Sequence, residues 1–475
     1  MNTRIYKQII FSGCITLMLG SCKKYLDINE NPNAALQPPI NGLLANVTNS
    51  SAINVWRIAD WTSYYTQYLA SPSAASTIDT YDDVNASGAW NGCYNVMTDL
   101  YDMRRFAVEK GLNAYIGVAD ILTAQQLNMI TNIWGDVPYG DAFLGVENIN
   151  PKFEDQHALY DTCLKLLDDG ITALQQPDAD GELDVNSDFI HAGDAGAWIK
   201  TAHALKARML NQISKTADYN ADAVLSELAQ AYTGNADDAQ VTAFDGSNPW
   251  EVEASNNAKL LLDGWLSAYF INATNGTTYG VFDPRLPNIT APTKFGDYRG
   301  TINGAGVNGA GSHGDPTDPQ ECYLTVGKWY SSDNSPLLII TYAECKFMEA
   351  EAQFRKGNKD DAYNAYIDGI KAHMQKMGIA DTAIQRYTTD PAVAVGAENL
   401  TLQRIMEEKY VAMFLSPVTW DDMRRIDYNY KDFMLPKNAV LSTFIRRLNY
   451  PADEISTNGE NVPNVQMTDH LWWDQ

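Results

Sequence analysis

The side chains most often used in catalysis are scattered along this chain without the spacing that a reaction needs. The histidines form no HExxH motif, and there is no Gly-x-Ser-x-Gly nucleophile motif and no phosphate-binding loop. Glycoside hydrolysis needs only two carboxylates about 5–9.5 Å apart, and 59 acidic residues always allow such a pair. A hydrolase therefore stays open as an alternative. Surface or helix-capping positions are expected for all six histidines: His157, His191, His203, His313, His373 and His470.

Carboxylates alternate along one acidic segment and offer the hard oxygen ligands that calcium prefers. They belong to Asp178, Asp180, Glu182, Asp184 and Asp188, with the amide of Asn186 between them. The favoured interpretation is a solvated acidic loop, so no cofactor is expected. A second candidate, Asp27-x-Asn29-x-Asn31, fails as an EF-hand loop because its sixth position is Pro32 rather than Gly.

Four arginines lie near the C-terminus of a chain that is otherwise acidic: Arg424, Arg425, Arg446 and Arg447. Guanidinium groups form bidentate pairs with carboxylates, and they also bind anionic ligands. Buried pairs with carboxylates are the favoured prediction.

Aromatic residues in polar loops are the strongest candidates for a ligand-binding site. The chain has 11 Trp and 26 Tyr, and these side chains combine a flat apolar face with a polar tip. A sugar ring can stack on such a face while adjacent Asn and Asp bind its hydroxyls. Packing in the core is the ordinary alternative for each one. The candidates are Tyr81, Trp90 and Asn91, then Tyr298 inside a glycine-rich segment, and Trp329 with Tyr330 beyond it.

The N-terminus has the features of an export signal followed by a lipidation site. Arg4 and Lys7 precede a short apolar run over 9–19, which is too short to span a bilayer. Gly20 and Ser21 then precede Cys22, as in a bacterial lipobox. These residues predict removal of 1–21 and attachment of lipid to Cys22, and acyl chains on that cysteine would anchor the protein firmly.

Charge and cysteine content exclude other classes. The net charge is −25 and the isoelectric point about 4.5, so the chain repels phosphate backbones and nucleic-acid binding is not expected. No later stretch is apolar and long enough for a transmembrane helix. Beyond Cys22, four cysteines lie outside any metal-binding spacing and are either free or joined in two disulfides: Cys93, Cys163, Cys322 and Cys345.

Apolar residues recur at helical spacing over most of the chain. This pattern predicts helices over 40–69, 99–111, 114–134, 157–174, 195–214, 221–232, 259–270, 337–356, 359–376 and 400–414. Asp194 is the expected N-cap of the fifth helix. Residues 233–336 are rich in Gly, Asn, Asp, Pro and Ser, and 296–314 contain seven glycines, which is typical of a long loop.

One predicted helix pair resembles a tetratricopeptide unit of about 34 residues. Residues 342–356 and 359–376 are separated only by Gly357 and Asn358, and small residues such as Ala350 and Ala362 recur where the two helices must meet. Several such pairs would form a solenoid-like scaffold.

Segments in a fixed order along the chain resemble those of the SusD/RagB family of outer-membrane nutrient-binding lipoproteins. The two most specific are 134–139 (WGDVPY) and 446–451 (RRLNYP). The other segments are 22–27 (CKKYLD), 29–33 (NENPN) and 193–208, which contains GD and WIK. Further along are 283–286 (DPRL), 342–352, which begins YAE and ends EAEA, and 408–425, which begins EKY and ends RR.

This resemblance implies a mainly α fold in which four tetratricopeptide-like helix pairs pack against a loop-rich half. It implies a cell-surface receptor, lipid-anchored in the outer membrane, that delivers oligosaccharide to a SusC-like TonB-dependent transporter. In such proteins an aromatic that contacts sugar often lies near the position of residues 81–92. Peptide is the alternative cargo, and a lipoprotein glycoside hydrolase is less favoured.

The expected organisation is a signal peptide (1–21), a tether (22–40) and one SusD-like domain (41–475). Within that domain a helical scaffold covers about 41–232 and 337–415, a loop-rich ligand side covers about 233–336, and 416–475 are expected to be irregular.

Overall fold

The computed structural model describes residues 38–177, 182–258, 264–306 and 320–475. Residues up to Pro39 belong to a unit separate from the compact unit Ile40–Gln475, to which all elements named below belong. Cys22 and the expected signal peptide lie outside the described residues, as do Asp178, Asp180 and His313.

The described residues are mainly helical, with six very short strands and five 3₁₀ turns. The helices are α2 (Ile40–Tyr65), α3 (Ser87–Lys110), α4 (Asn113–Trp134), α5 (Gln156–Leu174), α6 (Ala195–Gln212), α7 (Ala221–Leu228), α8 (Pro249–Ala258), α9 (Ala268–Thr274), α10 (Tyr342–Lys356), α11 (Lys359–Lys376), α12 (Asp381–Thr389), α13 (Leu402–Ala412), α14 (Val418–Arg425) and α15 (Ala452–Asn458). The 3₁₀ turns are Gly145–Glu147, Asn235–Asp237, Leu286–Asn288, Ala397–Asn399 and Trp472–Asp474.

In the part of the chain that the structure describes, three antiparallel two-stranded sheets join separate segments. β1 (Leu69–Ala70) pairs with β5 (Trp265–Leu266), with Leu69 opposite Leu266. β2 (Val137–Pro138) pairs with β3 (Phe153–Glu154), and β4 (Ala239–Val241) pairs with β6 (Leu337–Ile340). The first of these ladders ties the end of α2 to the loop-rich region 233–336.

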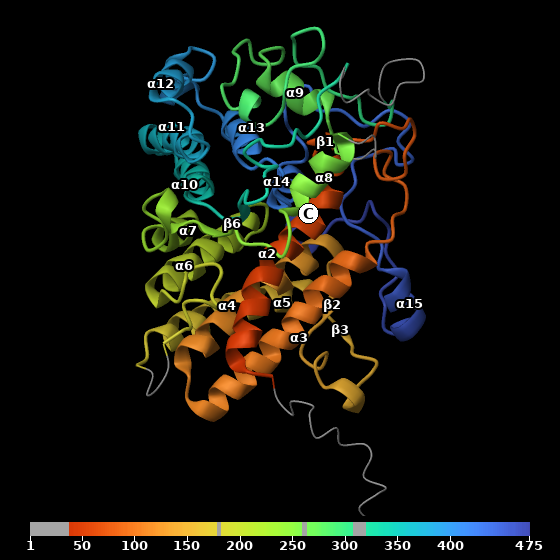
Figure 1. Ribbon diagram of the computed structural model, residues 1–475, viewed down its shortest axis with the longest axis vertical. Coiled ribbons are helices and arrows are strands. Elements are labelled where there is room, and N and C mark those ends of the chain that lie inside the picture. The colour runs from red at the N-terminus through yellow and green to blue at the C-terminus, as the bar shows by residue number, and fades with distance from the viewer. Residues whose placement is uncertain (1–37, 178–181, 259–263, 307–319) are drawn as a thin grey trace, which may run out of the picture. The chain divides into compact units, whose positions relative to one another are not determined.

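Four helix pairs follow one another along the chain. α2 packs on α3, α4 on α5, α6 on α7 and α10 on α11, and the pairs touch through α3 with α4, α5 with α6, and α7 with α10. Figure 1 shows α6, α7, α10 and α11 in succession along one side of the unit. The prediction of a mainly α fold built from tetratricopeptide-like pairs is confirmed.

The helices of the α4–α5 pair approach closely because glycines face each other between them. A Cβ on Gly117 would lie 2.9 Å from the carbonyl oxygen of Gly170, and a Cβ on Gly170 would lie 3.0 Å from the carbonyl oxygen of Gly117. Any larger residue at either position would push the two backbones apart.

The helices α10 and α11 of the predicted hairpin begin and end at the residues expected from the sequence. Thr341 caps α10 by accepting a hydrogen bond from the backbone N–H of Glu344, and Gly357 ends the helix with a φ of 83°. Ala350, Ala362 and Ala365 are buried between α10 and α11 and belong to a second apolar core with α12 and α13. Asp194 is the N-cap of α6, as expected, and accepts from Gly196 and Ala197.

Several expected boundaries are wrong. α3 begins at Ser87, so residues 87–92 are helical rather than part of a loop. Residues 337–340 form strand β6, because their continuous apolar run pairs with β4. The segment expected to be irregular, 416–475, contains α14 and α15, and α8 and α12 were not predicted. Of the helix expected over 259–270, residues 259–263 lie outside the described residues and 265–266 form β5.

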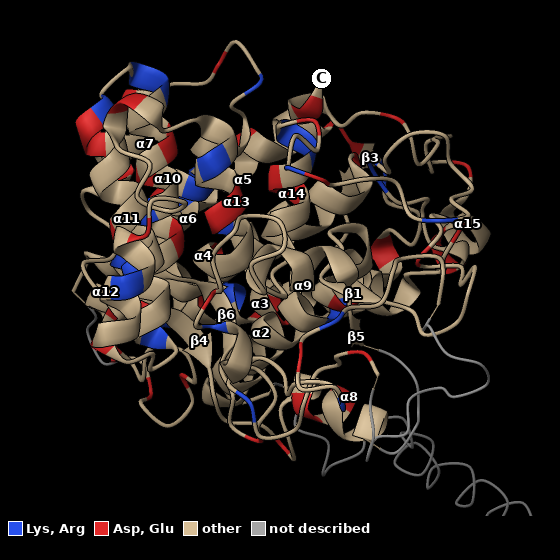
Figure 2. Cartoon of the chain, turned by 90° about the horizontal axis from the view of Figure 1, so that it is seen from above, with Lys and Arg blue, Asp and Glu red and all other residues tan. Residues whose placement is uncertain are grey.

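Most of the C-terminal arginines form buried pairs with carboxylates, as predicted. Arg425 contacts Glu351 and lies 2.7 Å from Asp422, while Arg424 pairs with Asp421 at 2.5 Å and Arg446 with Asp474 at 2.8 Å. Arg447 differs, because its guanidinium donates to the backbone carbonyl oxygen of Trp134. Figure 2 shows basic and acidic positions interspersed along the helices.

The four cysteines among the described residues are free and buried: Cys93, Cys163, Cys322 and Cys345. Burial raises the pKa of the Cys93 thiol to about 12 and that of Cys322 to about 11. Both thiols are therefore protonated and unreactive at neutral pH.

Candidate ligand-binding hollow

A hollow of about 770 Å³ opens in the loop-rich region beside α9. Its walls come from α9, from the segment that follows it, and from the loop that carries Tyr298. The lining residues are Ala268, Asn272, Asn275, Thr277, Phe282, Phe295, Gly296, Asp297, Tyr298, Arg299, Gly300, Ile302, Gln320 and Glu321. This volume falls in the range of about 300–1,000 Å³ that small-ligand sites occupy.

Three aromatic rings reach the hollow with accessible faces. Phe282 is 46% exposed and Phe295 54% exposed, while Tyr298 is half-buried. The ring centroids of Phe282 and Tyr298 lie 5.8 Å apart, and their planes are inclined by 52°. Exposed aromatic side chains that cluster in a hollow, unlike single exposed rings, mark interaction sites.

A buried ion pair fixes the turn that presents Phe282. Asp283 follows it directly and forms a two-point contact with Arg285, whose Nε donates to Asp283 Oδ1 at 2.9 Å. Arg285 is fully buried and also donates to Glu408 on α13 at 3.0 Å. The backbone N–H of Asp283 donates to the carbonyl oxygen of Thr274, at the end of α9, at 2.8 Å. Phe282 is therefore exposed on a rigid support.

A tight turn presents the other two rings. The backbone N–H of Thr293 donates to the carbonyl oxygen of Asp297 at 2.7 Å, and Thr293 Oγ1 donates to the Asp297 carboxylate at 2.5 Å. Gly296 has a φ of 77°, which allows the chain to reverse there. The turn thereby holds Phe295 and Tyr298 on the same wall.

Polar side chains surround these rings. The Asn275 side chain donates to the carbonyl oxygen of Tyr298 at 3.0 Å and accepts from the backbone N–H of Thr277. Asn272 and Gln320 also line the hollow. Amide and hydroxyl groups next to flat apolar faces match a sugar, whose rings have apolar C–H faces and hydroxyl rims.

Two of the charged residues that line the hollow, Arg299 and Asp297, pair with each other. Arg299 lies 2.7 Å from Asp297, and its guanidinium lies 4.4 Å from the centroid of Phe295. Hydrogen bonds from Thr293 and then from Arg299 hold the pKa of the Asp297 carboxyl below its usual value. Asp297 therefore remains ionised at neutral pH and cannot serve there as the proton donor that a glycoside hydrolase needs.

Of the predicted ligand residues, Tyr298 lines this hollow. Asn91 is exposed on the second turn of α3, and Trp329 is half-buried with its backbone N–H donating to the carbonyl oxygen of Asn288. Neither lines the hollow, so the structure does not gather these candidates into one site.

Two other candidates are buried, which corrects the expectation that they meet a ligand. Tyr81 is fully buried and packs edge-on against Tyr65, with centroids 5.8 Å apart. Trp90 is 3% exposed and packs edge-on against Trp134. Because α3 starts before Trp90, the helix turns this ring into the core, where no ligand can stack on it.

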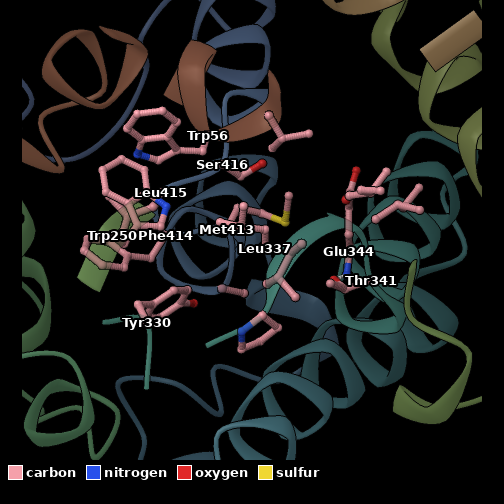
Figure 3. A pocket seen from close by; sticks show the side chains of 16 residues that line it. Trp56, Trp250, Tyr330, Leu337, Thr341, Glu344, Met413, Phe414, Leu415 and Ser416 are labelled. Carbon is pink, nitrogen blue, oxygen red and sulfur yellow. Dashed lines mark hydrogen bonds between the residues drawn. The ribbon is translucent and has the colours of Figure 1, made fainter. Parts of the chain in front are cut away.

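Tyr330 is also buried, so the same correction applies. Its hydroxyl lies 3.1 Å from His373 Nε2, and its ring packs edge-on against Phe414. Figure 3 shows Tyr330 on the wall of an interior apolar pocket shared with Trp56 and Trp250. That pocket has a volume of only about 30 Å³, room for little more than a water molecule.

In the described part of the acidic segment, the protein itself supplies the partners of Asp188. The carboxylate of Asp188 accepts from the backbone N–H of Ile190, His191 and Gly193 and from Trp198 Nε1 at 2.7 Å. It is therefore a buried structural acceptor rather than a free ligand. Among the residues that the structure describes, no group of three or more His, Cys, Asp or Glu side chains could hold a metal ion.

Phe282, Phe295 and the α9 asparagines are residues that sequence reasoning missed. The predicted ligand-binding aromatics are Trp and Tyr in loops, whereas two of the three rings at the hollow are Phe. The sequence does hold one indication of Phe282, because this residue directly precedes 283–286 (DPRL), one of the segments that resemble the SusD/RagB family.

In the parts of the chain that the structure describes, every helix is too short or too polar to cross a membrane.

Comparison with known proteins identifies the family and the fold. The SusD-like family model described as "Starch-binding associating with outer membrane" matches residues 31–451. A chitin-binding SusD homologue from Flavobacterium johnsoniae has a TM-score of 0.76 at 19% identity, covering 92% of this chain and 98% of its own. A SusD/RagB family protein from Bacteroides thetaiotaomicron has a TM-score of 0.73 at 22% identity, covering 92% and 99%.

A SusD homologue from Bacteroides fragilis gives the same TM-score of 0.73, at 20% identity and with 92% of this chain covered and all of its own. No curated protein sequence matches significantly. At these identities the structural matches establish a shared fold, while the family model covers most of the sequence. The chain therefore belongs to the SusD-like family described as starch-binding proteins that associate with the outer membrane.

Proposed function

We propose that this protein is a non-catalytic, lipid-anchored receptor on the cell surface that binds oligosaccharide in the hollow beside α9. It passes the oligosaccharide to a SusC-like TonB-dependent transporter in the outer membrane. The observation that carries the proposal is the cluster of Phe282, Phe295 and Tyr298, with accessible rings surrounded by amide side chains.

The composition of the hollow favours a neutral sugar over a charged ligand. Arg299 is already paired with Asp297, and Glu321 accepts a hydrogen bond from Thr301, so each of the three charged side chains that line the hollow has a partner within the protein. Rings and amides are the remaining recognition groups. The relatives agree with this cargo, since the family description names starch and one structural neighbour binds chitin.

Binding without hydrolysis fits the acids that line the hollow. Asp297 is held ionised, and Glu321 accepts a hydrogen bond at 2.5 Å from Thr301 Oγ1. A hydrolase would need one of its two acids to keep a proton near neutral pH.

Calorimetric titration of the full-length protein with maltoheptaose and with chitohexaose tests the proposal. We expect heat-releasing binding of at least one of them, with no new reducing ends after prolonged incubation. Release of reducing ends would favour the hydrolase. If the protein binds peptides from a tryptic digest of casein and binds neither sugar, the cargo is peptide rather than oligosaccharide.

The anchor and the transporter call for a separate experiment. Substitution of Cys22→Ala is expected to release the protein from the membrane fraction while leaving sugar binding unchanged. Purification of the wild-type protein from solubilised outer membranes should recover a TonB-dependent transporter with it. A Cys22→Ala protein that stays in the membrane fraction would contradict lipidation at this residue.

A further inference from the structure

Asp79 is a buried carboxylate that lies outside the hollow, where three segments of the chain meet. Its side chain is 1% exposed. Oδ2 accepts from the backbone N–H of Gly304 at 2.6 Å and of Ser71 at 3.1 Å, while Oδ1 accepts from Asn303 Nδ2 at 2.5 Å. A carboxylate that accepts three hydrogen bonds joins these segments strongly.

The segment 303–306 fits tightly between its neighbours. A Cβ on Gly304 would lie 1.8 Å from the carbonyl oxygen of Lys437, and one on Gly306 would lie 2.6 Å from the backbone nitrogen of Ala74. The backbone N–H of Lys437 also donates to the carbonyl oxygen of Asn303 at 2.8 Å. The position of this segment is therefore set by close backbone packing.

Hydrogen bonds connect Asp79 to the wall of the hollow. Asn303 Oδ1 accepts from Ser267 Oγ at 2.6 Å, and Ser267 is the N-cap of α9. The backbone N–H of Ala268 donates to the carbonyl oxygen of Thr301 at 2.7 Å. Ala268 and Ile302, which directly follow Ser267 and Thr301, both line the hollow.

We propose that Asp79 is a positioning residue for the ligand-binding hollow, because it holds the wall formed by 299–304 against the start of α9. This inference rests on the proposed oligosaccharide-binding function. Asp79 itself does not line the hollow, so it acts through Asn303 and Gly304. An amide in its place would put N–H donors against one or more of these three donors, which should loosen that wall and weaken binding without removing any ligand contact.

The charge on Asp79 changes within an accessible pH range. Burial raises the pKa of its carboxyl to about 6, against the opposing effect of the hydrogen bonds from Gly304, Asn303 and Ser71. Because this pKa is raised in the folded protein, protonation favours the packed arrangement over an open one in which the carboxyl meets water, so lowering the pH should not loosen the wall. Other titratable groups in the surrounding segments are Tyr81, Asp82, Asp83, Glu321 and Lys437.

The test compares Asp79→Asn with Asp120→Asn. Asp120 is also 1% exposed, and burial raises its pKa to about 6 as well, but it pairs with Arg104 between α3 and α4. Hydrogen–deuterium exchange is measured at pH 7.5 without ligand on peptides covering 264–270 and 299–306. We expect at least tenfold faster exchange in these peptides for Asp79→Asn and wild-type exchange for Asp120→Asn.

The same proteins are titrated with maltoheptaose and chitohexaose between pH 7.5 and pH 5. Asp79→Asn should bind at least fivefold more weakly than the wild type at pH 7.5, whereas wild-type affinity should not fall as the pH drops through about 6. Wild-type exchange in Asp79→Asn, or wild-type affinity in that variant, would overturn the proposal. If the wild type binds neither sugar, the proposed function fails and the exchange rates alone decide the role of Asp79.

Discussion

Phe282 and Tyr298 come from segments on either side of a tight turn, and their ring centroids lie 5.8 Å apart with planes inclined by 52°. Two rings at this angle cannot both lie flat against a planar ligand. They can contact two faces of one bound molecule, or successive units of a curved chain. The buried pair of Asp283 with Arg285 and the hydrogen-bonded turn at Thr293 hold both rings in place before any ligand arrives, which lowers the cost of ordering them on binding.

Two glycine-to-alanine substitutions should have opposite effects on stability, because only Gly117 lies where α4 and α5 approach closely. Gly117→Ala would place a Cβ 2.5 Å from Leu174 Cγ and 2.9 Å from the Gly170 carbonyl oxygen. We expect a loss of about 1–3 kcal/mol in unfolding free energy, because overpacking outweighs the higher helix propensity of alanine. Urea unfolding followed by circular dichroism measures it.

Gly88→Ala on α3 is the matched control. Its Cβ would meet nothing within 4 Å, so we expect a gain of up to about 1 kcal/mol from helix propensity alone. A Gly117→Ala protein as stable as Gly88→Ala would contradict the close helix contact.

The buried pair of Glu351 and Arg425 predicts a large loss of stability when one partner is neutralised. Burial opposes ionisation of Glu351, yet Arg425, Arg355 and Lys409 together lower the pKa of its carboxyl. Glu351→Gln leaves the buried Arg425 without this charge, and we expect a loss of about 3–5 kcal/mol.

Because the pKa of Glu351 is lowered in the folded protein, its contribution to stability is present above its ordinary pKa of 4.5 and is lost as the pH falls toward the lowered value. Glu349→Gln, which removes the more exposed contact with Lys346, should cost at most about 1 kcal/mol. Equal losses in the two variants at pH 7 would count against the pair as a stabilising contact.

Asp120 predicts a pH effect of the opposite sign. Burial raises the pKa of its carboxyl from 3.8 to about 6, although Arg104 acts to lower it. The folded protein thus holds this proton more tightly than the unfolded chain does, so its stabilising effect is complete below about 3.8 and is lost as the pH rises through about 6.

The unfolding free energy of the wild type minus that of Asp120→Asn should therefore decline by about 2 kcal/mol from pH 4 to pH 7.5. Urea titrations of both proteins at these two pH values give the difference. A difference that stays constant, or that grows with pH, would show that the side chain is not desolvated in the folded state.

The helical scaffold could be read from the sequence because its signals are local. The hairpin of α10 and α11 has a two-residue turn with Gly357 and a clear apolar period, and Asp194 marks the start of α6. α3 was misjudged at its start, since Gly88, Asn91 and Gly92 are poor helix formers. Gly92 is needed there because a Cβ would lie 2.6 Å from Asn54 Oδ1, and a tertiary contact of that kind has no local signal.

The binding site was only partly predictable for a related reason. Tyr298 lines the hollow as a loop aromatic, whereas Trp90 and Tyr330 are equally aromatic and lie in the core. Exposure depends on which segments pack over a ring, and that is decided by distant residues such as Trp134 and Phe414. Asp79 likewise acts on Gly304 across 225 positions of sequence.

The most direct test of the central claim is calorimetric titration of Phe282→Ala and Tyr298→Ala with whichever of maltoheptaose and chitohexaose the wild type binds. We expect each variant to bind at least tenfold more weakly, a change of about 1.4 kcal/mol, because each removes an exposed ring from the hollow. Trp329→Ala, which removes an aromatic residue outside the hollow, should bind like the wild type. Wild-type affinity in both hollow variants would contradict the assignment of this hollow as the ligand-binding site.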